Sequence, residues 1–289
     1  MFYGRCMDFK QNFKENLYAG LFAGEHNFTD CALALFRYQA QYNPVYGAYL
    51  QYLKVRPEQV QSLSEIPFLP IEFFKTQTVQ TGIFTPQTIF LSSGTTQSER
   101  SRHLLPEPEF YLLNARSIFE SCYGPLTDYV FLALLPSYLE QGHSSLVAMV
   151  DHFMTASCQP GKGFFLHDLA ALCAAVKQAG RQNKKIMLFG VTYALLDLAD
   201  YVQAHSLADL FGQVLIMETG GMKGRRREMI RSELHEQLKQ AFRVPTIHSE
   251  YGMTELLSQA YSLGEGIFRC PPTMQILLRD PNDPFSLDL

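Results

Sequence analysis

From Thr88 onward, short apolar runs alternate with amphipathic segments, and this alternation constrains the fold more than any other feature of the chain. Short apolar runs predict buried strands, whereas apolar residues that recur at three- and four-residue steps predict helices. Strands separated by whole helices pair in parallel and are joined by right-handed crossovers. The pattern therefore predicts an α/β fold with mostly parallel sheets flanked by helices.

The expected strands and helices alternate up to Glu255, except that two helices lie between the strands at 129–135 and 185–189. The apolar runs predict strands at residues 88–91, 129–135, 185–189, 213–218 and 246–248. The amphipathic segments predict helices at residues 107–122, 144–154, 168–178, 192–204 and 225–241, with Asp168 and Thr192 as N-caps. Strands at 259–262, 267–269 and 275–279 have no helices between them, which predicts a small antiparallel β appendage near the C-terminus.

Residues 1–85 have a different pattern and predict a helical N-terminal region packed on the core. Thr29 is in place to cap a helix that runs through residues 32–40. Four prolines then break the segment into short pieces, at Pro44, Pro57, Pro67 and Pro70. We expect two parts, residues 1–85 and an α/β core at residues 86–289.

Charge and cysteine usage exclude several classes of protein. The net charge is -4, and the only dense basic run is Arg225-Arg226-Arg227, so no basic face for nucleic acid is expected. The six cysteines form no Cys-x-x-Cys pair, which argues against a zinc site and suits a reducing compartment. No apolar run is long enough to span a membrane and the N-terminus lacks a secretory pattern, so we expect a cytoplasmic protein.

Three loops rich in Gly, Ser, Thr or Glu follow predicted strands, where ligands bind in parallel sheets. The first is Ser92-Ser93-Gly94-Thr95-Thr96, which offers backbone N–H groups and hydroxyls to phosphate and is followed by Arg100 and Arg102. The Walker lysine is missing, and such a loop read alone is more often a plain turn.

The second loop contains Gly220 and Gly221, whose lack of a side chain lets a flat ligand approach the backbone before a helix N-terminus. The third contains Glu250, Tyr251, Gly252, Thr254 and Glu255. Its two carboxylates suit a Mg²⁺ ion and its tyrosine suits a nucleotide base, although a pair of glutamates in a loop is more often only solvated.

Taken together, the three loops resemble the adenylate-forming superfamily of acyl-CoA synthetases, peptide-synthetase adenylation domains and luciferases. The string from His248 to Tyr261, with Glu218 to Arg227 before it, is most similar to the acyl-protein synthetase (LuxE-type) family. The segment from Leu134 to Glu140 adds to that similarity. The resemblance spans about Pro67 to Pro284, and it implies a nucleotide- and acyl-binding core.

The resemblance implies ATP and Mg²⁺ as cofactors and a role for each matching residue. Thr254 would contact the α-phosphate, Glu255 would bind Mg²⁺, and Arg102 would replace the lysine that usually follows the phosphate loop. The implied nucleotide-binding residues are Ser92, Ser93, Gly94, Thr95, Thr96, Gly220, Gly221, Tyr251, Gly252 and Thr254. The implied reaction is activation of a carboxylic acid, most simply a fatty acid, to an acyl-adenylate with release of pyrophosphate.

In the family the acyl group then passes to a protein thiol, so the implied partner is a thiol-bearing protein such as an acyl-CoA reductase-like enzyme. A homo-oligomer is also compatible with this expectation. Because the chain ends at Leu289, we expect the family's small C-terminal lid, with its catalytic lysine, to be absent. Completion of a turnover by this chain alone therefore stays open.

Three other functions fit parts of the sequence. Gly142-His143-Ser144-Ser145-Leu146 follows a strand as a serine-hydrolase elbow does, but the second glycine is missing. Cys270 is the most interesting thiol for an acyl carrier, although lone cysteines are usually inert. The third alternative is a non-catalytic nucleotide- or acyl-binding partner subunit, for which the missing lid speaks and the Thr254-Glu255 pair does not.

Overall fold

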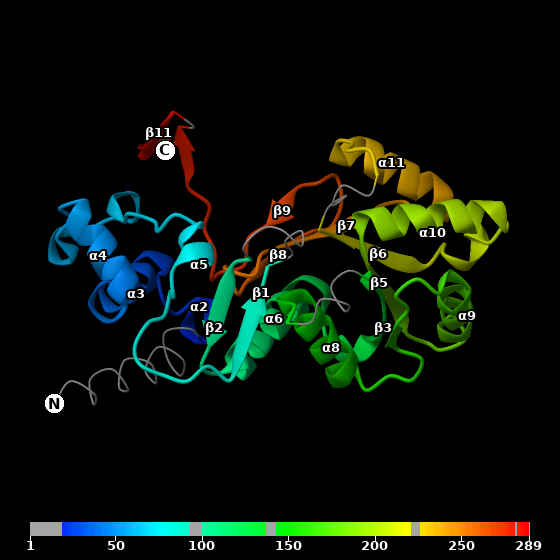
Figure 1. Cartoon of the computed structure of the whole chain (residues 1–289). Helices are drawn as coiled ribbons and strands as arrows, with labels where there is room; N and C mark the ends of the chain where they lie inside the picture. Colours follow the sequence, from blue (N-terminus) through cyan, green and yellow to red (C-terminus); the bar gives the residue numbers. More distant parts are fainter. Residues whose placement is uncertain (1–18, 93–99, 137–142, 221–225, 281, 289) are drawn as a thin grey trace. The chain divides into compact units, whose positions relative to one another are not determined.

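The computed structural model describes residues 19–92, 100–136, 143–220, 226–280 and 282–288, with side chains up to residue 283 (Figure 1). The chain forms two compact units, neither of which is continuous in sequence. Unit 1 comprises residues 1–89, 94–106 and 270–289, and unit 2 comprises residues 90–93 and 107–269. The predicted division between residues 85 and 86 stays a prediction.

Unit 1 begins with helices, as its proline-broken pattern indicates. Asn27 caps α3, because its Oδ1 accepts a hydrogen bond from the backbone N–H of Thr29 at 2.7 Å. The prediction that Thr29 is the cap is wrong, since the helix starts before it. The helical elements of this unit are α2 (Ala19–Ala23), α3 (Phe28–Tyr42), α4 (Pro44–Tyr52), η2 (Pro57–Gln59), η3 (Leu63–Glu65) and α5 (Phe73–Thr76).

The core of unit 1 forms where α3 and α4 pack together. Phe36 and Tyr46 meet edge to face with their ring centroids 6.0 Å apart, and the Tyr46 hydroxyl donates to the Pro67 carbonyl. The buried cluster consists of Leu33, Phe36, Tyr46, Leu50 and Val60.

Two short sheets lie outside the main sheet of unit 2. One pairs β1 (Thr88–Leu91), as predicted, with β2 (Arg102–Leu105), which the sequence pattern did not indicate. The other pairs β10 (Leu278–Asp280) with β11 (Asp283–Asp288) antiparallel. The predicted small antiparallel appendage is confirmed for this second sheet, whereas two strands expected in it, at 259–262 and 267–269, belong to the main sheet.

The described residues of unit 2 form a seven-stranded sheet of order β4-β3-β5-β6-β7-β8-β9. The first five strands in this order pair in parallel, and β8 and β9 continue the sheet antiparallel. The predicted α/β fold with mostly parallel pairing is confirmed. The strands are β3 (Tyr129–Leu134), β4 (Gly163–Phe164), β5 (Lys185–Val191), β6 (Val214–Thr219), β7 (His248–Gly252), β8 (Gln259–Ser262) and β9 (Phe268–Arg269).

Helices cover both faces of this sheet (Figure 1). On one face α10 packs against α11, and on the other α6 packs against α8. Every residue of β3 is buried, as expected for a parallel strand covered on both sides. The helices are α6 (Pro108–Tyr123), α8 (Ser145–Ser157), α9 (Leu169–Ala179), α10 (Thr192–Ala204) and α11 (Arg231–Phe242), with the short η4 (Leu126–Asp128) and η5 (Ala208–Leu210).

Two predicted helix starts are wrong. Thr192 is the first residue of α10 and not its cap, and its hydroxyl donates instead to a Glu218 carboxylate oxygen at 2.6 Å. The helix predicted from residue 225 begins only at Arg231, because Ile230 before it has an extended backbone. Arg226 in the preceding segment is paired with Asp197 and Asp200 of α10. In the parts of the chain that the structure describes, no helix is both long and apolar enough to cross a membrane.

Candidate functional site

A cavity of about 330 Å³ lies at the carboxyl ends of β6 and β7, entirely within unit 2. Thr219 closes β6 and Gly252 closes β7, and residues from α6 and α8 complete the walls. The cavity is lined by Ser92, Tyr111, Ser144, Ser145, Leu146, Met149, Thr219, Gly220, Glu250, Gly252, Met253, Thr254, Glu255 and Ser258. This edge of the sheet is where ligands bind in parallel α/β folds.

The cavity brings together described residues from all three loops that the sequence singled out. The predicted site residues that line it are Ser92, Gly220, Gly252, Thr254 and Glu255. They come from segments up to about 160 positions apart, so only the fold makes them neighbours. Four other predicted residues of the first loop, Ser93, Gly94, Thr95 and Thr96, and Gly221 of the second, lie outside the described residues.

Two predicted site residues do not line the cavity. Tyr251 is in β7 with its side chain 42% exposed. Arg102 is the exposed first residue of β2 and belongs to unit 1. Their roles stay predictions.

Backbone contacts hold the walls of the cavity in place. The N–H of Leu91, which ends β1, donates to the carbonyl of His143 at 2.9 Å, and this bond fixes Ser92 beside the start of α8. Ser144 caps α8 by accepting from the N–H of Val147 at 3.3 Å. In place of the nucleophile of a hydrolase elbow, the Ser144 hydroxyl is a helix cap at the cavity wall.

β7 presents its successive side chains to opposite faces of the sheet, because side chains alternate along a strand. Glu250 and Gly252 face the cavity. Tyr251, between them, packs edge to face on Phe268 of β9 with ring centroids 6.2 Å apart. Arg231 at the start of α11 lies 4.9 Å from the centre of that Phe268 ring. The strand therefore separates an acidic cavity from an exposed aromatic surface.

The predicted strand at 246–248 was displaced toward the N-terminus, since β7 begins at His248 and continues to Gly252. Glu250 and Tyr251 consequently lie within a strand and not in a loop. The strand tolerates the glutamate because Thr219 of β6 hydrogen-bonds its carboxylate and because β8 pairs with it, with Glu250 opposite Tyr261.

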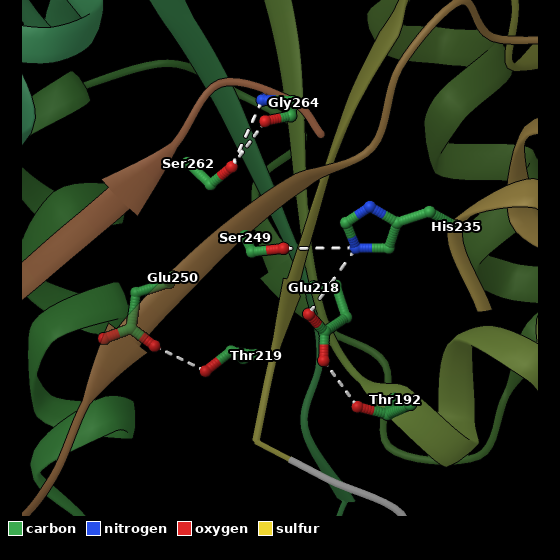
Figure 2. A network of polar contacts seen from close by, with 8 residues as sticks. All are labelled: Thr192, Glu218, Thr219, His235, Ser249, Glu250, Ser262 and Gly264. Atoms are coloured by element: carbon green, nitrogen blue, oxygen red, sulfur yellow. Dashed lines mark hydrogen bonds and ion pairs between the residues drawn. The ribbon is translucent and has the colours of Figure 1, made fainter. Parts of the chain in front are cut away.

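Glu250 is a buried carboxyl group on the wall of the cavity, with its residue only 9% exposed. The Thr219 hydroxyl donates to its Oε2 at 2.5 Å (Figure 2). Burial, with a smaller contribution from the nearby Glu218, raises the pKa of Glu250 to about 7, although the Thr219 hydrogen bond offsets part of the rise. At neutral pH this group is therefore partly protonated.

A second polar cluster lies behind the cavity, where β6 and β7 face α10 and α11 (Figure 2). Glu218 accepts from Thr192 at 2.6 Å, and its other oxygen lies 4.0 Å from His235 Nε2. The same His235 nitrogen lies 3.2 Å from the Ser249 hydroxyl. All four side chains are buried. Their contacts link α10 and α11 to β6 and β7 beside the cavity.

Ser249, His235 and Glu218 are the residue types of a hydrolytic triad, but their geometry does not form one. Serine and carboxylate both approach Nε2 of the histidine, whereas a triad uses the two ring nitrogens separately. Ser249 is fully buried and is not among the described residues that line the cavity. Ser249 is therefore not placed to act as a nucleophile, and the cluster supports the strands that form the cavity.

Sequence reasoning noticed Glu250 only as one half of a possible cation pair and missed Tyr111 and Thr219. A signal for Glu250 did exist, because it alternates with Ser249 and Tyr251 in a segment directly after a predicted strand. Tyr111 carries no such signal: it lines the cavity only because α6 packs beside α8, where its hydroxyl donates to the Ser145 carbonyl at 3.1 Å.

Two other cavities are less suited to chemistry. One of about 870 Å³ is an open groove at the opposite edge of the sheet, where β5 and β6 begin, and its lining includes Asp128, Lys184 and Asp209. Lys184 there already donates to the Thr127 carbonyl. Another of about 300 Å³ lies between helices of unit 1 and is mainly apolar, with Phe36 and Phe74 in its wall. None of the described predicted site residues lines either one.

Comparison with known proteins does not place the chain in a family. No protein-family model matches the chain, and a search of curated proteins finds no match either.

Proposed function

We propose that unit 2 binds ATP and activates a carboxylic acid as an acyl-adenylate, in a fold of the adenylate-forming type and with a site like that of acyl-protein synthetases. The observation that carries the proposal is the convergence of Ser92, Gly220 and the Thr254-Glu255 pair on one cavity. The loops after β6 and β7 reach the same edge in any parallel sheet, whereas Ser92 follows β1, which lies outside that sheet, so its presence in the cavity is the part that strand topology does not explain.

The groups present fit a magnesium nucleotide. Ser92 and Thr254 bring hydroxyls suited to phosphate oxygens, and Glu255 brings the single carboxylate that Mg²⁺ often takes from a protein. Gly220 adopts a left-handed backbone (φ 74°) directly after β6, a conformation that a residue with a side chain rarely adopts. When bound, Mg²⁺ would neutralise phosphate charge and orient the leaving pyrophosphate.

The two faces of β7 suit different parts of the bound substrates. The nucleotide base would lie on the Tyr251 side, where the exposed ring is held by Phe268. The acid would lie in the cavity, against Tyr111 and Glu250, and the phosphates would meet it at Ser92 and Thr254.

In the proposed reaction, a carboxylate oxygen of the acid attacks the α-phosphorus, and the bond from that phosphorus to the oxygen bridging the β-phosphate breaks. Pyrophosphate leaves and the acyl-adenylate remains. The contribution of the chain is to hold both anions in line despite their repulsion, which depends on positioning and on hydroxyl donors and needs no enzyme nucleophile. The resemblance further suggests transfer of the acyl group to a thiol on a partner protein.

The proposal is tested by the exchange of labelled pyrophosphate into ATP in the presence of carboxylic acids of several classes. We expect acid-dependent exchange by the wild-type chain and a loss of at least about 100-fold in Glu255→Gln, because the substitution removes the charge that would hold Mg²⁺. Glu233→Gln, an equivalent change at an exposed position on α11, is the matched control and keeps wild-type exchange.

Two outcomes would contradict the proposal in different ways. If ATP binds but no acid supports exchange, the chain is the non-catalytic nucleotide-binding subunit. If Glu255→Gln exchanges pyrophosphate as fast as the wild type, the cavity is not the site of the reaction.

A further inference from the structure

The cavity of the proposed site contains a buried carboxyl group that the reaction itself does not use. Glu250 Oε2 accepts the hydroxyl of Thr219, and the residue is nine-tenths buried while it lines the cavity. Gly252 leaves room for the Glu250 carboxyl group because it has no side chain. A Cβ at position 252 would lie only 2.4 Å from Glu250 Oε1. The carboxyl group is thus placed where a bound acid would touch it.

No cation balances this carboxyl group among the residues that the structure describes. Its charged and titratable neighbours are Glu218 from β6, Tyr111 from α6 and Tyr261 from β8. Each of these is neutral or negative. The nearest cationic candidate in the cluster, His235, lies 4.0 Å from Glu218 on the other side of the strands. Among the described residues, the groups around Glu250 at the floor of the cavity are therefore acidic or neutral.

The class of acid that fits this floor follows from desolvation. An alkyl chain pressed against Glu250 would remove water from the carboxyl group and offer no hydrogen bond in return, which is unfavourable. An ammonium group would supply both the missing charge and a donor, and charge-assisted hydrogen bonds are the stronger kind.

We infer that the acid activated in this cavity carries a protonated amino group, which pairs with Glu250. The inference rests on the proposed function, and it replaces the fatty acid that the resemblance suggests with an amine-bearing carboxylic acid. Tyr111, Leu146, Met149 and Met253 line the cavity as well, so the portion between the two ends of the acid is apolar.

The state of Glu250 before binding supports this assignment. Burial and Glu218 raise its pKa to about 7, so much of it is protonated at neutral pH. A bound ammonium group favours the carboxylate and lowers that pKa. Binding of the amine-bearing acid at pH 7 therefore releases protons, and calorimetry in buffers of different ionisation enthalpy measures that release.

The test uses acids of the same carbon number: hexanoate, 6-aminohexanoate and L-norleucine. Their affinities for the full chain are measured by titration calorimetry, with and without ATP and Mg²⁺. We expect at least one of the two amine-bearing acids to bind about 10-fold or more tightly than hexanoate, with proton release. In Glu250→Gln, which keeps the shape and removes the charge, the preference disappears, whereas the surface variant Glu233→Gln retains it.

The remaining outcomes overturn the inference. These are equal or tighter binding of hexanoate, an unchanged preference in a folded Glu250→Gln, no measurable binding of either amine-bearing acid at millimolar concentration, or tight Mg²⁺ binding to Glu250 that both amines fail to displace. Failure of the proposed function is a separate result. If only the inference fails, pyrophosphate exchange with hexanoate persists. If ATP does not bind, the proposed function and the inference both fail.

Discussion

Glu250 shows how one residue can determine the chemistry of a cavity. A glutamate in a strand is expected to point to solvent, yet this one is buried between β6 and β8 with Thr219 as its donor. Its identity was visible in the sequence. Its burial and its neighbours were not, because they depend on strand pairing over separations of about ten and thirty positions.

The raised pKa of Glu250 predicts a pH-dependent stability. Its folded-state pKa of about 7 exceeds its ordinary value of 4.5, so between these values the folded chain binds more protons than the unfolded chain. The resulting stabilisation is present below about pH 4.5 and is lost as the pH rises through 7, by roughly 3 kcal/mol in total. Urea unfolding at several pH values between 5 and 8 measures this loss.

The comparison with Glu250→Gln isolates this effect, because buried histidines titrate in the same range. Burial lowers the pKa of His248, which makes stability rise with pH and so acts in the opposite direction. The free energy of unfolding of the wild type relative to Glu250→Gln should fall from pH 5 to pH 8. Parallel pH profiles for the two proteins would show that Glu250 titrates normally.

At the scale of elements, the periodicity of the sequence predicted strands better than it predicted their ends. Buried apolar runs gave β1, β3, β5 and β6 with small errors at their boundaries. The ends were missed where a polar residue has a tertiary partner. β7 continues through Glu250 because Thr219 satisfies the carboxylate, and α10 begins with a threonine that bonds Glu218 and does not cap the helix.

The link between α10 and β6 predicts the effect of a change at Thr192. Thr192→Val keeps the shape and removes the hydroxyl that donates to buried Glu218 at 2.6 Å. The loss leaves a buried carboxylate oxygen without its donor and should lower the free energy of unfolding by about 1–3 kcal/mol. Thr192→Ser restores the donor and should recover much of that stability in denaturant titrations. Equal destabilisation by valine and serine would mean that packing of the methyl group, and not the hydrogen bond, matters here.

At the scale of the whole molecule, the sequence predicted the class of fold but not the composition of the two units. The alternation of apolar runs and helices is local, and it correctly indicated a mostly parallel sheet with helices on both faces. Unit 1, by contrast, combines three separate stretches of chain, including residues 270–289. Nothing in local periodicity indicates which distant stretches pack together.

The same limit applies to the candidate site. The sequence indicates its residues one loop at a time, and the fold brings five of them to a single cavity, Ser92, Gly220, Gly252, Thr254 and Glu255. Tyr111, Thr219 and the serines of α8 were not predicted there, because their place depends on how α6 and α8 cover the sheet. The motifs therefore predicted several of the residues that line the cavity, whereas the packing of helices on the sheet determines its shape and charge.

Direct measurement of ATP binding tests the central claim most simply, because every step proposed for the cavity requires it. Titration calorimetry of the full chain with ATP and Mg²⁺ should show one site per chain. Thr254→Val, which removes a hydroxyl at the cavity wall, should weaken that site by about 10-fold or more, and Thr254→Ser should not. Absence of binding at millimolar ATP, or binding that Thr254→Val leaves unchanged, would contradict the assignment of this cavity as a nucleotide site.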